Sequence, residues 1–447
     1  MTLLGPLFAG EAMAALFSDR ARLQGMLDFE AALARAEAAV ALFPAAAAES
    51  IGCACKADLF DIAALSQDTA AAGNPAIPMV KQLTALVARQ DAVAARFVHW
   101  GATSQDAIDT GLVLQIRAGL ASLEPDLQRL ATTLATLAET HAKTVMIGRT
   151  LLQQAVPVTF GLKAAGWLAA VERTGARLAA AGAAAQVLQF GGAAGTLAAL
   201  GDRGLDIAAA LAKELDLVLP ELPWHGHRDR LVDLAAALGL LVGTLGKMAR
   251  DLSLLMQTEV AEAFEPAGQG RGGSSTMPHK RNPIACAVAL AAATRVPPLV
   301  ATLLAAMPQE QERGLGGWHA EWETLPEIFL LAAGALHHVV DAIAGLTLDT
   351  RRMRDNIEAT RGLVMAEAVT MALAERIGKQ EAHHLVESAC RRALADGAHL
   401  RDILAHEPAV AAQLTPEALD HLFAPGSYLG MAERFVQRAL AARKPRS

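Results

Sequence analysis

The chain has 447 residues, is 53% hydrophobic and only 4% aromatic, and carries a formal net charge of −7. This length allows a large core in more than one domain, and the acidic balance argues against nucleic-acid binding, which needs a basic surface. Alanine and leucine dominate, and they favour helices over sheets because they lose little side-chain entropy in a helix.

The sequence predicts a soluble, cytoplasmic protein. The N-terminal segment MTLLGPLFAGEAMAALFSDR has no basic start followed by an apolar core, so no signal peptide is indicated. The apolar run at residues 234–246 is too short to span a bilayer. The four cysteines have neither the spacing of a disulfide framework nor that of a zinc site, which predicts reduced thiols. They are Cys53, Cys55, Cys286 and Cys390.

The predicted elements fall into three helical regions. Residues 1–110 contain short helices separated by turns, such as a helix at 20–41 and the Gly/Pro loop AGNPAIPMV at 72–80. The middle region, 111–348, is dominated by long Ala/Leu segments with few breakers, which indicate a five-helix bundle. These segments lie at about 106–142, 156–189, 228–264, 284–307 and 325–346. Residues 349–447 return to shorter helices.

One of the long helices carries a heptad seam, in which apolar residues alternate spacings of four and three. Such a seam keeps one stripe of the helix against a partner, so these residues are predicted to pack in the core. Helices of this length exceed the core of a compact monomer, so we expect subunits to share them. The seam consists of Leu234, Leu238, Leu241, Leu245, Met248, Leu252 and Leu255.

Three polar segments interrupt the helical pattern: HWGATSQDAIDT at 99–110, GRTLLQQAVPVTFG at 148–161 and GGSSTMPHKRNP at 272–283. Each combines hydroxyl groups with glycine or amide groups at a helix boundary, and these groups are natural donors to a carboxylate or phosphate. For one segment alone, capping by Thr103 or Ser104 is the simpler interpretation. Three such segments in one helical chain favour a composite anion site.

Other polar groups have simpler interpretations. The glycines of GQGRGG, at 268–273, predict a mobile lid. The histidines show no zinc spacing, which predicts packed or surface side chains. The acidic run Glu259, Glu262 and Glu265 is interpreted as a solvated helix face.

The three segments resemble the signature regions of the fumarase/aspartase superfamily, in the same order, and SSTMPHKRNP is close to its most specific signature. The resemblance covers the whole chain and extends to FSDRARLQGMLDFEAALARAEA, AGNPAIPMVKQL and LQFGGAAGTLAALG. It implies an all-α, three-domain subunit divided at about 110 and 348. Four subunits would pack their five-helix bundles into a twenty-helix core, with each active site built from three chains. No metal or organic cofactor is expected.

The resemblance also implies roles for individual residues. Ser274 matches the catalytic base, which exchanges a proton at the carbon next to a carboxylate. Lys280 and Asn282 match residues that bind this carboxylate, and cationic neighbours with loop closure would lower the serine pKa. The other candidate substrate-binding residues are Thr103, Ser104, Thr150, Gln153, His99, Arg228 and Arg281. Further candidate cations are Arg149, Arg230 and Arg313.

Two departures from the family pattern narrow the chemistry. Leu151 stands where many members have a histidine that helps to protonate the leaving group or to bind substrate, and Ala287 stands where a glutamate often pairs with that histidine. An amine or hydroxide leaving group needs this proton, whereas a carboxylate, with a pKa of about 4, does not. The sequence therefore favours a cycloisomerisation that closes a lactone. Two alternatives stay open: a cycloisomerase or lyase for another polyanion, and a structural member without activity.

Overall fold

A computed structural model describes residues 3–267, 272–273, 277 and 280–443. Over these residues the regular structure is mainly helical, with two small two-stranded sheets, which confirms the all-α prediction. The chain divides into two compact units. Unit 1 comprises Met1–Leu127, Thr174–Gly246 and Val288–His338, and unit 2 comprises Gln128–Arg173, Lys247–Ala287 and Val339–Ser447. The three domains proposed from the sequence stay a prediction.

The N-terminal part of unit 1 is built around α3 (Asp19–Ala39), which packs against α4 (Ala45–Ala54) and α9 (Gly204–Leu215). The Ser18 hydroxyl accepts a hydrogen bond from the Ala21 amide at the start of α3, as expected for an N-cap. The remaining helices of this part are α1 (Gly5–Phe8), α2 (Glu11–Leu16), α5 (Ile62–Ala72) and α6 (Ala76–Ala88).

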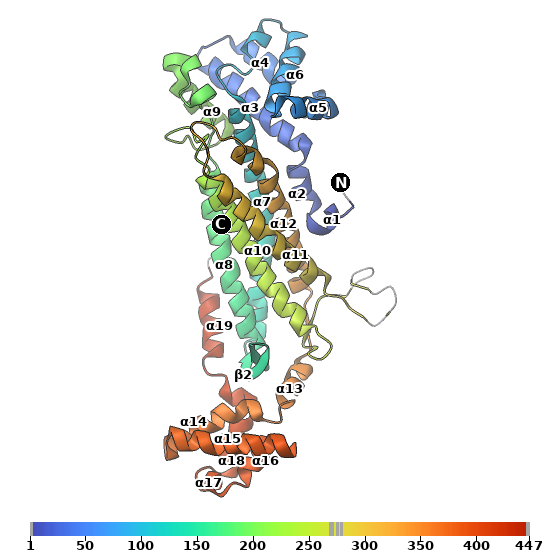
Figure 1. Cartoon of the computed structure of the whole chain (residues 1–447), viewed down its shortest axis with the longest axis vertical. Coiled ribbons are helices and arrows are strands. Elements are labelled where there is room, and N and C mark those ends of the chain that lie inside the picture. The colour runs from blue at the N-terminus through green and yellow to red at the C-terminus, as the bar shows by residue number, and fades with distance from the viewer. Residues whose placement is uncertain (1–2, 268–271, 274–276, 278–279, 444–447) are drawn as a thin grey trace. The chain divides into compact units, whose positions relative to one another are not determined.

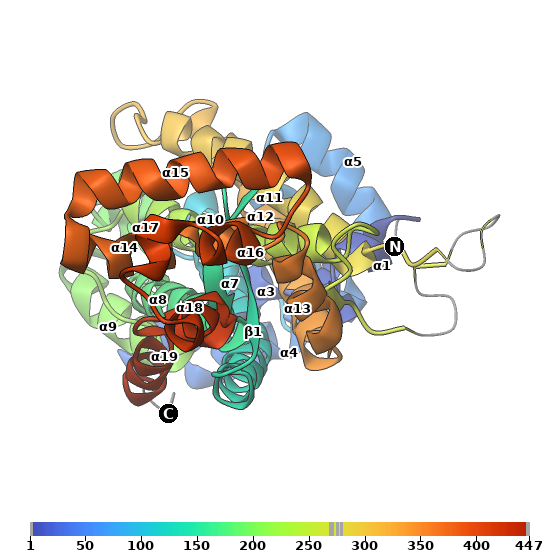
Figure 2. The ribbon, with the colours of Figure 1, turned by 90° about the horizontal axis from the view of Figure 1, so that it is seen from below.

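Five long helices follow, as predicted: α7 (Ser104–Thr140), α8 (Phe160–Ala185), α10 (Asp229–Leu255), α11 (Ile284–Ala306) and α12 (Gly317–Ala344). Within unit 1, their segments run side by side (Figures 1 and 2). A Cβ at Gly239 of α10 would lie 3.2 Å from Val300 of α11, so these two helices pack closely. All seven seam residues are buried, none more than 4% exposed, which confirms their core prediction.

Unit 2 contains a hairpin that the sequence reasoning missed. Strand β1 (Val145–Thr150) pairs antiparallel with β2 (Gln153–Thr159) through a turn at Leu151 and Leu152, both with positive φ. The prediction of helix from residue 156 was wrong, because the β-branched Val156 and Val158 flank Pro157, which lacks a helical N–H donor. A second pair joins β3 (Ala263–Phe264) to β4 (Thr347–Leu348), so α10 also ends before 264.

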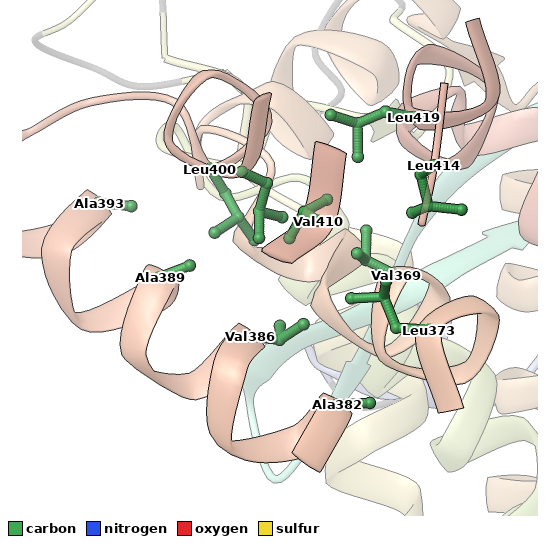
Figure 3. Packing of buried hydrophobic residues seen from close by; sticks show 11 residues of the cluster. Val369, Leu373, Ala382, Val386, Ala389, Ala393, Leu400, Val410, Leu414 and Leu419 are labelled. Carbon is green, nitrogen blue, oxygen red and sulfur yellow. The ribbon is translucent and has the colours of Figure 1, made fainter. Parts of the chain in front are cut away.

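The C-terminal helices of unit 2 have a hydrophobic cluster of their own (Figure 3). Val369 and Leu373 of α14 (Ala366–Ile377) pack with Val386 of α15 (Lys379–Asp396) in this cluster. The other helices of this segment are α13 (Thr350–Glu358), α16 (Leu400–Ala405), α17 (Pro408–Ala411), α18 (Pro416–Phe423) and α19 (Ala432–Ala441). Short 3-10 helices of the chain lie at Ala57–Leu59, Ala94–Phe97, Gly192–Ala194, Ala198–Arg203, Leu363–Met365 and Pro425–Tyr428.

The expectation that no segment is long enough to cross a bilayer needs correction. By length and composition, α10, α11 and α12 each meet the requirement for a membrane span. In α10 and α12, 61% of the apolar window is buried inside the protein, so its side chains serve internal packing. In α11 only 33% is buried, so most of its apolar window is exposed or part-exposed over the residues that the structure describes.

A close crossing of α3 and α7 generates the first prediction. A Cβ on Gly25 would lie 2.7 Å from the carbonyl oxygen of Gly111, so the backbones touch and neither can yield easily. Gly25→Ala is expected to lower the free energy of unfolding by about 1–3 kcal/mol. The control is Gly52→Ala in α4, where an added Cβ meets nothing within 4 Å. This substitution should raise the free energy of unfolding by roughly 0.5–1 kcal/mol. Urea unfolding measures both, and equal stability of the two variants would contradict the crossing.

Candidate active site

The start of α7 is organised by the carboxylate of Asp106, which is fully buried. It accepts backbone hydrogen bonds from Thr103 (3.0 Å), Gly191 (3.0 Å) and Gly192 (2.9 Å), and it lies 2.7 Å from His225 Nε2. The Thr103 and Ser104 hydroxyls make no hydrogen bond with any residue that the structure describes. Capping by either hydroxyl is therefore not observed, and both groups remain available as donors.

His99 lies four residues before Thr103 and is held by a buried carboxylate. Its Nδ1 is 2.5 Å from Oε1 of Glu30, a side chain that is 1% exposed, whereas the His99 side chain is 16% exposed. Burial lowers the pKa of His99, but the charge and hydrogen bond of Glu30, with the charge of Asp106, raise it above its ordinary value. The site therefore favours the imidazolium form.

Arg228 lies in the interior of unit 1, with its guanidinium 0% exposed. Nη1 donates to Asp109 Oδ2 at 2.7 Å, Nη2 to Glu321 Oε2 at 2.6 Å, and Nε to Glu321 Oε1 at 3.0 Å. The guanidinium also stacks on the Trp224 ring, 4.6 Å from its centroid. Because all three nitrogens serve internal carboxylates, we correct the prediction that Arg228 binds substrate and assign it a structural role.

The two carboxylates around Arg228 are joined to further groups. Trp318 Nε1 donates to Asp109 Oδ1 at 2.9 Å, and Gln309 donates to Glu321 Oε1 at 3.2 Å. Burial raises the pKa of Glu321, and the charge of Asp109 raises it further, whereas Arg228 lowers it; the net pKa lies above the ordinary value. Arg313 donates to Gln105 Oε1 at 3.0 Å, at the part-exposed edge of this network. Arg230 is part-exposed.

In unit 2, the hairpin presents Thr150 and Gln153 at its exposed tip, where they are paired in register. Arg149 on the same strand donates through Nη1 and Nη2 to the two oxygens of Glu262, at 2.9 and 2.7 Å. Asn356 Nδ2 donates to Glu262 Oε1 at 2.7 Å. Arg149 therefore anchors the hairpin and is not a free cation.

Glu262 and Glu265 are 0% and 3% exposed, so the interpretation of their run as a solvated face was wrong. Only Glu259 is exposed. The Glu265 carboxylate accepts hydrogen bonds from the Ala285 (3.0 Å) and Cys286 (2.8 Å) amides, which are among the first N–H groups of α11. Both acids have buried partners that a periodic pattern does not reveal.

The third signature segment leads directly into α11. Ser274 and residues 268–271 of the predicted lid lie outside the described residues. The Asn282 amide donates to the Gly272 carbonyl at 2.8 Å, and a Cβ on Gly272 would lie 2.5 Å from the Asn282 oxygen. Arg281 donates to the Glu265 carbonyl at 2.7 Å, and Lys280 is exposed. The base of this segment is thus tied to Glu265, while the Lys280 side chain is open to solvent.

The predicted site residues therefore form two groups. Unit 1 carries His99, Thr103 and Ser104, and unit 2 carries the hairpin tip with Lys280, Arg281 and Asn282. The sequence analysis did not include Glu30 or Asp106 among the site residues. For Glu30 the sequence offered one signal, an acidic residue on a mainly apolar face of its helix. Among the described residues, no group of three or more His, Cys, Asp or Glu side chains could hold a metal ion.

The fold and the polar segments define a class: a helical lyase whose donor groups lie at the ends of long helices. A family model described as "Lyase" matches residues 8–297, and one described as "Adenylosuccinate lyase C-terminus" matches residues 362–439. The chain belongs to this lyase family, and the resemblance to the fumarase/aspartase superfamily is confirmed.

Similar proteins cover nearly the whole chain. The 3-carboxy-cis,cis-muconate cycloisomerase of Pseudomonas aeruginosa is 60% identical over 97% of this chain and 95% of its own length. The crystal structure of the 3-carboxy-cis,cis-muconate lactonizing enzyme from Pseudomonas putida is 54% identical, with a TM-score of 0.94 and 98% of each chain covered. The N-acetyl-S-(2-succino)cysteine lyase of Dickeya dadantii is 34% identical over 98% of this chain and 96% of its own length.

The buried ion cluster generates the second prediction. Arg228→Met is expected to lower the free energy of unfolding by about 3–5 kcal/mol, because it leaves the Asp109 and Glu321 carboxylates without their buried cation. Arg230→Met, two residues along and part-exposed, is the matched control and should change it by less than about 0.5 kcal/mol. Both are measured by chemical denaturation at equal protein concentration. An Arg228→Met variant as stable as its control would remove the structural role of the cluster.

Proposed function

We propose that the chain is a cycloisomerase, an intramolecular lyase that interconverts 3-carboxy-cis,cis-muconate and 4-carboxymuconolactone. The reaction belongs to protocatechuate breakdown through the β-ketoadipate pathway. The observation that carries the proposal is the 60% identity, over nearly the full length, to a Pseudomonas aeruginosa protein of that name. The Leu151 and Ala287 departures support it, because a departing carboxylate needs no proton donor.

In the proposed reaction, an oxygen of one substrate carboxylate adds to a carbon of the double bond, which forms the C–O bond of the lactone. The neighbouring carbon, next to a second carboxylate, becomes an aci-carboxylate carbanion and takes a proton from Ser274. The reverse reaction removes this proton and breaks the C–O bond, so atoms and charge balance. Lys280 and Asn282 are proposed to hold the carboxylate on which negative charge develops, since preorganised donors stabilise such charge.

The remaining substrate carboxylates are assigned to the hydroxyl and amide donors. Thr103 and Ser104 have hydroxyls without a partner among the described residues, and Thr150 and Gln153 are exposed at the hairpin tip. Arg281 and His99 are proposed as additional cations. The reaction is proposed to need no cofactor, since proton transfer and electrostatic stabilisation account for every step.

We also propose that the protein is a cytoplasmic homotetramer whose active sites combine three chains. The apolar window of α11 supports shared helices, because only 33% of it is buried by the described part of the chain. The division of the candidate residues between two units is also compatible with a shared site.

The proposed function is tested with purified protein and 3-carboxy-cis,cis-muconate. Loss of the ultraviolet absorbance of the diene, with the lactone identified by NMR, is the expected result. No loss with this substrate would overturn the proposal. A sulfonated muconate tests the alternative cycloisomerase, which would release no second product, and succinyl adducts test the alternative lyase, which would release fumarate from them. Binding without turnover of any of them would indicate a structural member.

The third prediction concerns Lys280. Lys280→Met is expected to lower kcat/KM by at least about a hundredfold, roughly 2.7 kcal/mol, because it removes the proposed cation beside the developing charge. Lys379→Met at the exposed start of α15 is the matched control and should leave kcat/KM unchanged. Steady-state kinetics, with circular dichroism as a check on folding, measures both. Near-normal turnover by Lys280→Met would show that another group supplies the cation.

A further inference from the structure

We propose that Glu30 is a positioning residue for the reaction: it fixes the His99 imidazole in one orientation and in its protonated form, so that Nε2 donates to a substrate carboxylate. This inference rests on the proposed function and extends it to a residue of α3 that lies outside all three signature segments.

The contact between the two side chains is short and one-sided. Glu30 Oε1 lies 2.5 Å from His99 Nδ1, while the other oxygen, Oε2, is buried and has no partner among the described residues. Among the described residues, His99 is therefore the only hydrogen-bond partner of the Glu30 carboxylate. A buried carboxylate without a compensating charge is costly, so Glu30 stabilises the imidazolium form of His99.

The second ring nitrogen is left for another partner. With Nδ1 turned to Glu30, the orientation of the ring is set, and in the imidazolium form Nε2 also carries a proton. Nε2 has no partner among the described residues, and the side chain keeps 16% of its surface exposed. The pair therefore offers one outward donor that carries positive charge, as an anionic ligand requires.

The backbone holds His99 in place as well. His99 has φ +58, a left-handed conformation that costs a non-glycine residue about 1 kcal/mol or more. Gly101 follows with φ +71, and a Cβ there would lie 2.5 Å from the Leu200 side chain. This constrained turn leads to Thr103 and Ser104, so the cation and the two free hydroxyls are carried by one short segment.

The other ionisable groups near the pair do not compete for the proton. Glu37 lies seven residues along α3, and its two buried oxygens have no partner among the described residues. Burial, and then the charge of Glu30, raise the pKa of Glu37 to about 9, which keeps it neutral at pH 7. Burial raises the pKa of the Cys55 thiol, and the charges of Glu30 and then Asp28 raise it further, against a smaller lowering by Arg35. Asp106 favours the His99 cation, as Glu30 does.

The sign of the pH dependence follows from these contacts. The pKa of His99 is raised in the folded protein, so its imidazolium is present below that pKa and is lost as the pH rises through it. Substrate binding that uses this cation weakens over the same interval. Without the Glu30 charge, the interval moves to lower pH.

The test compares Glu30→Gln, which keeps the shape of the side chain and removes its charge, with Glu37→Gln on the same helix. In Glu30→Gln, KM is expected to rise at least about tenfold with a smaller change in kcat, as for the loss of a ground-state contact. The alkaline limb of kcat/KM should move to lower pH by at least about one pH unit, and Glu30→Asp should restore part of it. Glu37→Gln should leave this limb in place, because Glu37 is already neutral.

NMR of isotope-labelled histidine, assigned with a His99→Asn variant, separates this inference from the proposed function. In the wild-type protein without substrate, His99 should titrate above the ordinary value of about 6.5, and Glu30→Gln should lower the midpoint. These results would support the pairing even if the protein did not act on muconates. A wild-type His99 that titrates at or below the ordinary value, or a midpoint unchanged by Glu30→Gln, would overturn the inference, and the wild-type measurement decides if the variant fails to fold.

Discussion

The arrangement of unit 1 depends on one buried cation. Arg228, just before α10, pairs with Asp109 of α7 and Glu321 of α12, so a single guanidinium joins three of the long helices. Removing a guanidinium and two carboxylates from water is costly, and close ion pairing offsets this cost only when all three groups are present. The geometry of the cluster therefore fixes the ends of these helices relative to one another. Asp106 lies one helical turn before Asp109 and holds the loop that carries Thr103, because its carboxylate accepts a hydrogen bond from the Thr103 amide.

Internal ion pairing near the candidate residues explains how a protein of net charge −7 can present donors to a polyanion. Two arginines near the candidate residues form ion pairs inside the protein: Arg228 pairs with two acids, and Arg149 pairs with Glu262. Glu265 neutralises the start of α11, where the third signature segment ends. Among the remaining groups, Asp106 holds the Thr103 amide and Glu30 holds the His99 imidazole, while the Lys280 side chain is exposed.

The sequence predicted the elements that depend on local patterns. The Ala/Leu segments and the heptad seam of α10 identified the long helices, because helix propensity and apolar periodicity are local properties. The hairpin at Val145–Thr159 was missed because its β-branched residues lie beside a helical segment and its strands are short. The partners of Glu30 and Glu262 could not be predicted, since Glu30 is separated from His99 by 69 residues and Glu262 meets Asn356 from 94 residues away. Periodicity carries no information about such distant partners.

Proton transfer to the carbon beside a substrate carboxylate is the step that the arrangement is proposed to serve. It is tested most directly by converting 3-carboxy-cis,cis-muconate in D2O and locating the deuterium in the lactone by NMR. One deuterium should be found, at one of the two hydrogen positions of that carbon, because a single group on the protein delivers it to one face. Deuterium spread equally over both positions, or a lactone formed no faster than without protein, would contradict a base held in a fixed site.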